Sequence, residues 1–231
     1  MDITRREFLG YTAGGAISVM GLPLPESTPT ATRLRKLDKW RVLGTTRRPS
    51  IPESALGYHA AIPVERQRFE PWEKSAVSSC SLLIYPSLLV INQTKAAVLT
   101  RCMNGGATVV IESGAGFMKH FAFRWHRREL RERLQIPVAA PVDLWSHGSR
   151  PSTPYVEYTW PRRARIRDFS RVVPPAEQPG EIIAWAGELP VAFKRRVGAG
   201  TLIYLGSPLG PALWAGDVDA RRWLHAVAHA A

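Results

Sequence analysis

Hydrophobic and polar positions predict an alternation of strands and helices, and the clearest part lies in the middle of the chain. Residues 81–85 and 107–111 are nearly continuous apolar runs, which is typical of parallel strands covered on both faces. Between them Asn92 is a predicted N-cap, and apolar residues recur on one helical face until Asn104 and two glycines end the helix. These segments predict a βαβ unit with short connections in an open parallel sheet.

Weaker patterns flank this unit. Residues 41–45 and 64–69 read as strands, and residues 52–61 are compatible with a helix. Residues 117–134 are also compatible with a helix, although they are rich in aromatic residues and arginine. Residues 137–179 are rich in proline, tryptophan and arginine, so we expect short strands and loops over one side of the sheet.

The C-terminal part of the chain returns to a regular pattern. Residues 181–185, 191–196 and 201–205 read as strands, and the Gly-Ala-Gly sequence before the last of them predicts a hairpin turn. Asp217 is a predicted cap for a final helix. That helix can turn three residues toward the core, namely Trp223, Leu224 and Val227.

The start of the chain differs from the rest. Residues 4–10 read Thr-Arg-Arg-Glu-Phe-Leu-Gly and precede an apolar run that is too short to span a bilayer. They resemble the bacterial twin-arginine export signal, with Gly10 where lysine is preferred, and the matching positions are Arg5, Arg6, Phe8 and Leu9. The resemblance implies folding in the cytoplasm and export across the inner membrane by the Tat translocase. No clean cleavage site follows, so the product is expected to be periplasmic, or membrane-anchored if the signal stays attached.

Length and composition limit the number of domains and indicate the kinds of groups that the protein can recognise. If residues 1–32 are a signal peptide and linker, residues 33–231 amount to about 200 residues, enough for a single α/β domain. The net charge is +12, and 25 of the 31 basic residues are arginine. This indicates either recognition of phosphate or carboxylate groups or a coding bias toward arginine.

The arginines also bear on possible partners. The densest runs, residues 124–133 and 162–171, predict nonspecific, salt-sensitive attraction to anionic polymers. No aromatic platform is interleaved with them along the sequence, so we expect no specific nucleic-acid partner.

Two segments resemble a known family. Residues 82–116 and residues 189–210 are similar to the class I glutamine amidotransferase-like superfamily, which includes many noncatalytic members. The resemblance implies a three-layer, doubly wound, mostly parallel, flavodoxin-like sheet with an antiparallel hairpin near the C-terminus. Active members carry a cysteine at a strand-to-helix turn and a later His-x-Glu pair. Here Ser113 occupies that turn and no His-x-Glu follows, so glutamine hydrolysis by the family mechanism is not expected.

Polar residues at the carboxyl ends of the strands form the candidate ligand site. In open α/β sheets ligands bind outside these strand ends, so we expect the side chains to gather around one shallow polar site. They are Thr45, Thr46, Ser87, Glu112, Ser113 and Ser207. Glu112 can bind a sugar hydroxyl or a cation there, or instead pair with an arginine. Ser113 is either a catalytic serine that uses His120 or His147 as base, or a turn serine that caps the next helix.

Cysteine and histidine offer little further chemistry. Cys80 and Cys102 are the only cysteines, and they either form one disulfide or are two small buried side chains. His225 and His229 are spaced four apart on the final helix but have no acidic or cysteine partner in metal-ligand spacing, so no metal and no cofactor are predicted.

The sequence leaves three functional hypotheses. The first is an exported, noncatalytic domain that binds a small ligand, a sugar or a partner protein at the carboxyl edge of its sheet. The second is an exported serine hydrolase that uses Ser113. The third is a basic module that binds anionic envelope polymer.

Overall fold

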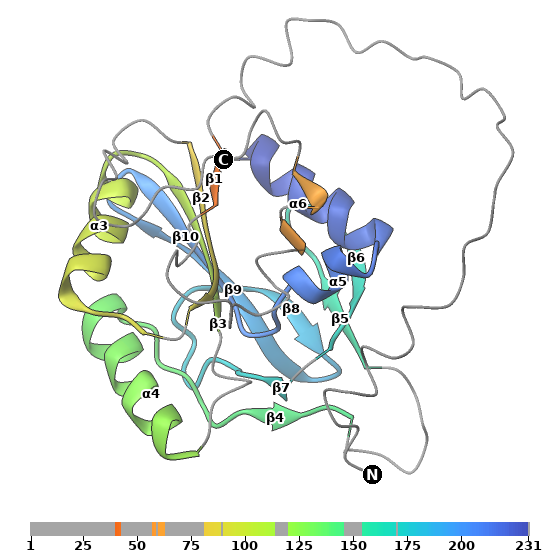
Figure 1. Cartoon of the computed structure of the whole chain (residues 1–231), viewed down its shortest axis with the longest axis horizontal. Coiled ribbons are helices and arrows are strands. Elements are labelled where there is room, and N and C mark those ends of the chain that lie inside the picture. The colour runs from red at the N-terminus through yellow and green to blue at the C-terminus, as the bar shows by residue number, and fades with distance from the viewer. Residues whose placement is uncertain are drawn as a thin grey trace, which may run out of the picture. The chain divides into compact units, whose positions relative to one another are not determined.

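An eight-stranded mixed sheet forms the core of the larger of two compact units, residues 34–231 (Figure 1). The structure, a computed structural model, describes residues 40–42, 57–58, 60–62, 81–88, 90–113, 120–145, 154–169 and 171–230. The strand order is β1-β2-β3-β10-β9-β8-β5-β6. Its strands are β1 (Trp40–Val42), β2 (Leu82–Leu88), β3 (Thr108–Ser113), β5 (Tyr155–Tyr158), β6 (Ala164–Arg167), β8 (Glu181–Ala186), β9 (Leu189–Val197) and β10 (Gly200–Leu205).

The remaining elements lie beside this sheet. A separate two-stranded sheet pairs β4 (Val142–Asp143) with β7 (Arg171–Val172). The helices are α3 (Gln93–Asn104), α4 (His120–Leu134), α5 (Gly210–Trp214) and α6 (Val218–Ala230).

The predicted βαβ unit is confirmed. Strands β2 and β3 pair in parallel, with Leu82 opposite Thr108, and α3 connects them. The Asn92 side chain accepts a 2.8 Å hydrogen bond from the Lys95 N–H, which is the N-cap expected from the sequence. Gly105 ends the helix, as predicted.

The C-terminal elements also form where the sequence places them. Strands β9 and β10 pair antiparallel around Gly198, whose φ of 57° suits glycine in a tight turn. Asp217 Oδ1 accepts a 3.0 Å hydrogen bond from the Ala220 N–H and so caps α6. The three predicted core residues of this helix are buried, namely Trp223, Leu224 and Val227.

The predicted fold class is wrong. Strands β1, β2, β3 and β10 pair with one another in parallel, but every further pair from β10 to β6 is antiparallel. The sheet is therefore mixed rather than a mostly parallel, doubly wound, flavodoxin-like layer. The difference arises in residues 137–179, where β5 and β6 join the central sheet as a hairpin and need no helical crossover.

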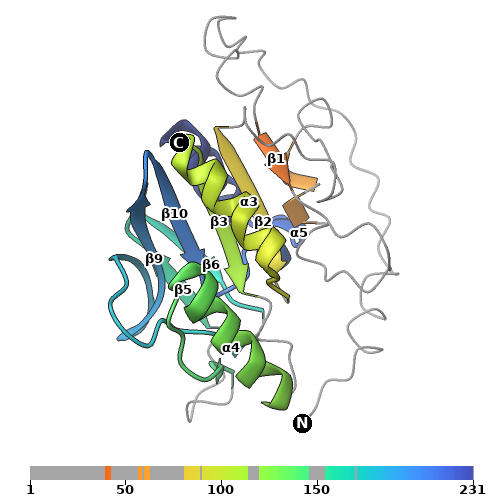
Figure 2. The same cartoon turned by 90° about the vertical axis from the view of Figure 1, so that its left-hand side faces the viewer.

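Helices cover both faces of the sheet. Helices α3 and α4 lie on one face, as Figure 2 shows, and pack on Leu83, Val109 and Tyr204. On the other face α5 and α6 pack on Ile84, Ile203 and the inner side of β5 and β6. The Trp223 indole is fully buried there and donates a 2.8 Å hydrogen bond to the Trp160 carbonyl.

Some sequence predictions fall outside the described residues. These are the export motif at Arg5, Arg6, Phe8 and Leu9, the strand at residues 64–69, and the site residues Thr45 and Thr46. Among the helices that the structure does describe, none is long and apolar enough to cross a membrane.

Candidate functional site

The carboxyl edge of the parallel strands holds a buried carboxylate. Glu112 lies near the end of β3 and is 0% exposed. Its Oε1 accepts hydrogen bonds from the Tyr58 hydroxyl at 2.7 Å, from the Leu209 N–H at 2.7 Å and from the Gly210 N–H at 3.0 Å. Because β10 runs parallel to β3, the chain leaves the sheet beside Glu112, and the first amides of α5 point at its carboxylate. Glu112 therefore ties β3 to α5 and to Tyr58.

A second buried carboxylate lies close to the first. Asp168 is 0% exposed, and its Oδ1 accepts a 2.7 Å hydrogen bond from the Ser207 hydroxyl. Burial raises the pKa of Tyr158, and the negative charges of Glu112 and Asp168 raise it further. We call Tyr58, Glu112, Tyr158, Asp168 and Ser207 the buried acidic cluster.

The phenol of Tyr58 is perturbed by the same carboxylate. Burial raises the pKa of Tyr58 well above its usual value, and the charge of Glu112 and the hydrogen bond to it add to the shift. Tyr58 therefore stays protonated and keeps donating its hydrogen bond to Glu112 across the physiological pH range.

Ser113 lies on the opposite face of the sheet from Glu112, because successive side chains of a strand alternate. It is 1% exposed and forms a hydrogen bond with Tyr204, which lowers the pKa of Tyr204 by less than burial raises it. The Tyr204 hydroxyl in turn donates a 2.9 Å hydrogen bond to the Val173 carbonyl. A nucleophilic serine has to be reached by substrate, and this serine sits inside the layer that α3 and α4 cover.

The structure thus brings together some predicted site residues and separates others. Glu112 and Ser207 both belong to the buried acidic cluster, whereas Ser113 faces the other layer. Ser87 lies in β2. Ligand binding at this edge stays a prediction. Sequence reasoning missed Asp168, Tyr58 and Tyr158, because nothing in their local sequence marks them as buried neighbours of Glu112.

The predicted disulfide and the histidine pair are the remaining candidates from the sequence. Cys102 is buried on α3, and Cys80 lies outside the described residues, so the disulfide stays a prediction. His225 and His229 lie on α6, and the described part of the chain contains no group of three or more metal-ligating side chains.

A second feature lies on α4. Its buried stripe, Phe123, His126, Leu130 and Leu134, repeats every three or four residues and packs the helix onto the sheet. The opposite side is exposed and carries mainly arginine. We call Arg124, Trp125, Arg127, Arg128 and Arg131 the basic face of α4.

Few acidic groups neutralise this basic face. Arg131 forms a 3.4 Å ion pair with Glu177, and both side chains are more than half exposed. The Arg128 guanidinium lies 4.0 Å from the ring centre of Trp125, a side chain that is 60% exposed. Within the described residues, Arg124 and Arg127 have no ion-pair partner.

The C-terminal end of α4 is held by a residue from the sheet. Arg195 of β9 donates hydrogen bonds to the Leu134 carbonyl at 2.5 Å and to the Gln135 carbonyl at 2.9 Å. Gln135 has a φ of 52°, the left-handed conformation usual just past a helix end. The fork of Arg195 therefore satisfies carbonyl groups that the helix leaves unpaired.

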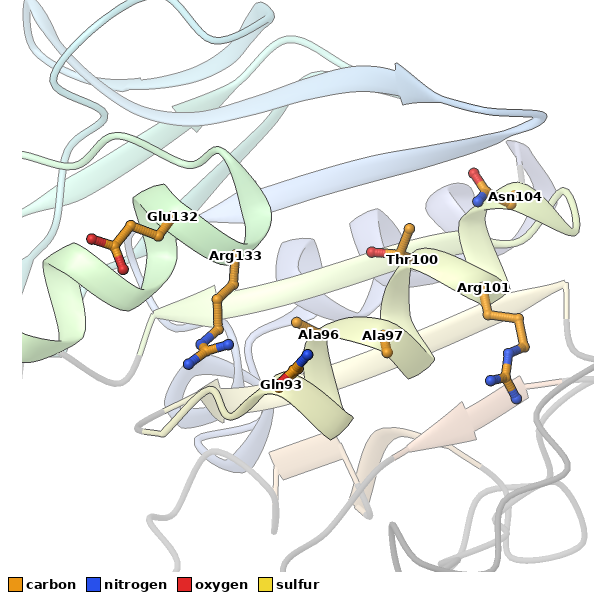
Figure 3. A pocket seen from close by; sticks show the side chains of 8 residues that line it. All are labelled: Gln93, Ala96, Ala97, Thr100, Arg101, Asn104, Glu132 and Arg133. Atoms are coloured by element: carbon orange, nitrogen blue, oxygen red, sulfur yellow. The ribbon is translucent and has the colours of Figure 1, made fainter.

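An open groove of about 590 Å³ runs between α3 and α4 (Figure 3). The side chains that line it are Gln93, Ala96, Ala97, Thr100, Arg101, Asn104, Glu132 and Arg133. Arg101, Glu132 and Arg133 all line it, so the groove carries both charge signs.

Comparison with known proteins identifies the fold but no family. No family model matches the sequence, and no curated protein matches it either. Solved structures do match. A β-galactosidase from Halorubrum lacusprofundi superposes with a TM-score of 0.55 at 15% identity over 80% of this chain and 30% of that one. A GH42 β-galactosidase from G. stearothermophilus gives 0.52 at 16% identity, over 73% of this chain and 27% of that one.

A cytoplasmic protein from Salmonella typhimurium LT2 matches over nearly its whole length. Its TM-score is 0.57 at 10% identity, and the match covers 83% of this chain and 98% of that one. The chain therefore spans about a third or less of the two glycosidases but nearly the whole of this smaller protein. At these identities the likeness concerns the fold alone.

These matches correct the family resemblance drawn from the sequence. The two segments at residues 82–116 and 189–210 were compatible with a glutamine amidotransferase-like, flavodoxin-like domain, but the matching structures include two β-galactosidases, and the sheet is mixed, with antiparallel pairs from β10 to β6. Membership of the amidotransferase-like superfamily is therefore wrong as a prediction. The local strand and helix patterns used for it are shared by many α/β proteins. The twin-arginine resemblance gains no support from these matches.

Proposed function

We propose that the chain is a noncatalytic binding domain that holds anionic polymers through the basic face of α4. The observation that carries the proposal is the surplus of exposed arginine on this helix, including Arg124 and Arg127, which lack ion-pair partners in the described part of the chain. Guanidinium groups pair with carboxylate, sulfate and phosphate groups through two parallel hydrogen bonds.

The spacing of the arginines supports an external partner. Arg124 and Arg128, and likewise Arg127 and Arg131, stand four residues apart, so like charges neighbour each other along the helix. This repulsion disfavours the free helix surface and is relieved when an anionic chain lies along it. Trp125 adds an exposed apolar ring on the same surface.

The proposal that the domain is noncatalytic is supported by the burial of the polar side chains at the carboxyl edge of the sheet. Glu112 and Asp168 are fully buried and accept structural hydrogen bonds, and Ser113 is 1% exposed. The match to nearly the whole of a smaller protein supports a domain that can stand alone.

The test is retention of the full chain on immobilised heparin, a sulfated polysaccharide. We expect the protein to bind at low salt and to elute as the salt concentration rises, because counterions replace the arginine contacts. The double variant Arg124→Gln and Arg127→Gln is expected to elute at clearly lower salt.

The matched control is the double variant Arg221→Gln and Arg222→Gln. These two exposed arginines lie on α6, so the control loses the same net charge from another helix. Elution of the control near the wild-type position supports the basic face of α4. Equal shifts in the two double variants would mean that only net charge matters and would overturn the assignment to α4.

A further inference from the structure

The outer face of the β5–β6 hairpin is covered by none of the described helices. Burial alternates along both strands, with Val156, Tyr158, Ala164 and Ile166 turned into the core against α6. The other set of side chains points outward, namely Tyr155, Glu157, Arg165 and Arg167. In the antiparallel register Tyr155 lies opposite Arg167, and Glu157 lies opposite Arg165.

Aromatic rings and guanidinium groups alternate on this surface. The Arg165 guanidinium carbon lies 4.4 Å from the ring centre of Tyr155. The Arg167 guanidinium carbon lies 5.2 Å from the ring centre of Trp145 and 5.0 Å from that of Phe169. We call Trp145, Tyr155, Glu157, Arg165 and Arg167 the aromatic–arginine face.

Both outer rings keep a substantial free surface. Trp145 is 49% exposed and Tyr155 is 36% exposed. The Trp145 backbone N–H donates a 2.9 Å hydrogen bond to Asp143 Oδ1, which fixes the turn that follows β4. The backbone of Trp145 is therefore fixed, and its large aromatic side chain is held at the surface. Burial of this ring would be favourable, so its exposure is a feature that calls for a partner.

Arg167 is placed to recognise an anion. Its side chain is partly buried between two aromatic rings, and its Nε is buried without a hydrogen-bond partner among the described residues. Partial removal from water strengthens the attraction between a guanidinium and an incoming carboxylate or sulfate.

We propose that the aromatic–arginine face binds an acidic saccharide. The pyranose rings stack on Trp145 and Tyr155, and the acid groups pair with Arg167 and Arg165. Glu157 decides the ligand class: its carboxylate is 71% exposed and lies 4.0 Å from Arg165, so it can accept hydrogen bonds from sugar hydroxyl groups.

This site is distinct from the basic face of α4 and does not depend on it. The face of α4 offers a row of charges to a long polymer, whereas the hairpin offers rings and mixed charges to a short segment. A trisaccharide is therefore the suitable probe, because it is too short to gain from a row of separate charges.

The experiment is isothermal titration of the full chain with tri-galacturonic acid, a carboxylated saccharide. We expect saturable binding that Trp145→Ala and Arg167→Gln each weaken by about tenfold or more, as for removal of an anchor side chain. The control variants are Trp214→Ala and Arg221→Gln. Trp214 is also exposed, at 53%, but lies at the end of α5, and Arg221 is an exposed arginine on α6, so both controls should bind like the wild type.

Several results would overturn the proposal. They are absence of saturable binding by the wild type, equal binding of the neutral trisaccharide of galactose, equal losses in the Trp214→Ala control, and tighter binding of a short single-stranded oligonucleotide. The Arg124→Gln, Arg127→Gln double variant separates the two sites: we expect it to lose heparin retention and to keep trisaccharide binding. If trisaccharide binding falls with it instead, the hairpin is not an independent site.

Discussion

The Tyr58 hydroxyl donates a 2.7 Å hydrogen bond to the fully buried carboxylate of Glu112. The two residues lie 54 positions apart, and their contact fastens a short helical segment to the end of the central strand β3. The backbone beside Tyr58 lies close to the start of α5, because a Cβ added at Gly57 would lie 1.8 Å from the Gly210 carbonyl oxygen. Glu112 is thus the meeting point of three segments of the chain.

Removal of the Tyr58 hydroxyl should destabilise the fold. In Tyr58→Phe a buried carboxylate loses the hydroxyl that donates to it, and we expect the free energy of unfolding to fall by about 1–3 kcal/mol. Urea denaturation measures the change. The control is Tyr155→Phe, which removes a hydroxyl from an exposed tyrosine, and it should alter stability by less than about 0.5 kcal/mol. A loss no larger than in this control would contradict the structural importance of the contact.

Buried tyrosines predict a loss of stability in alkali. The pKa values of Tyr58, Tyr158 and Tyr204 are all raised in the folded state, chiefly by burial. Below about pH 10 these phenols are protonated in both states, and above it the unfolded chain gives up its protons first. Above about pH 10, each of these tyrosines therefore lowers the free energy of unfolding by about 1.4 kcal/mol per pH unit. The three together lower it by about 4 kcal/mol per pH unit.

The measurement is the free energy of unfolding between about pH 9 and pH 11, together with the ultraviolet absorbance of phenolate. We expect the three phenolates to appear only as the protein unfolds. Titration of all tyrosines near their ordinary pKa, without loss of structure, would contradict this prediction.

The end of α4 offers a stabilising substitution. Gln135 has a φ of 52°, which costs a residue with a side chain more than it costs glycine. Gln135→Gly should therefore raise the free energy of unfolding by about 0.5–1 kcal/mol. A matched substitution at an ordinary exposed helix position, Glu132→Gly, should lower it by about 1 kcal/mol. Destabilisation by both changes would argue against the left-handed conformation at Gln135.

Export is tested separately, because it rests on the sequence alone. Replacement of Arg5 and Arg6 together by lysine keeps the charge but removes the paired arginines of the predicted motif. We expect a fusion of the native chain to a reporter to appear in the periplasm and the double variant to stay in the cytoplasm. Equal distribution of both proteins would contradict the predicted Tat signal.

Local patterns predicted the elements well, while the contacts between distant segments were not predictable. The apolar runs of β2 and β3 and the caps at Asn92 and Asp217 identify their elements because the cause is local. The hairpin β5–β6 was expected only as loops and short strands, since its arginines face solvent and leave just two buried positions in each strand.

The candidate site shows the same limit. Glu112 and Ser113 are neighbours in sequence, yet strand alternation sends them to opposite layers. Trp145 and Arg167 are far apart in sequence and share no local signal, yet the fold brings the turn after β4 beside the end of β6. The sequence also predicted no aromatic platform among the arginines. Trp145 and Tyr155 come to lie beside Arg167 and Arg165 only in the folded chain.

Strand β6 is the last strand of the described sheet, so one row of its backbone groups has no strand partner. Unpaired backbone N–H and C=O groups at a sheet edge can form hydrogen bonds with a strand of a second chain, which is a common route to aggregation. Here the strand is four residues long, and Arg165 and Arg167 alternate along it. A second copy that approached edge to edge would bring these cations together, so the strand resists self-association while its surface stays open to anionic molecules.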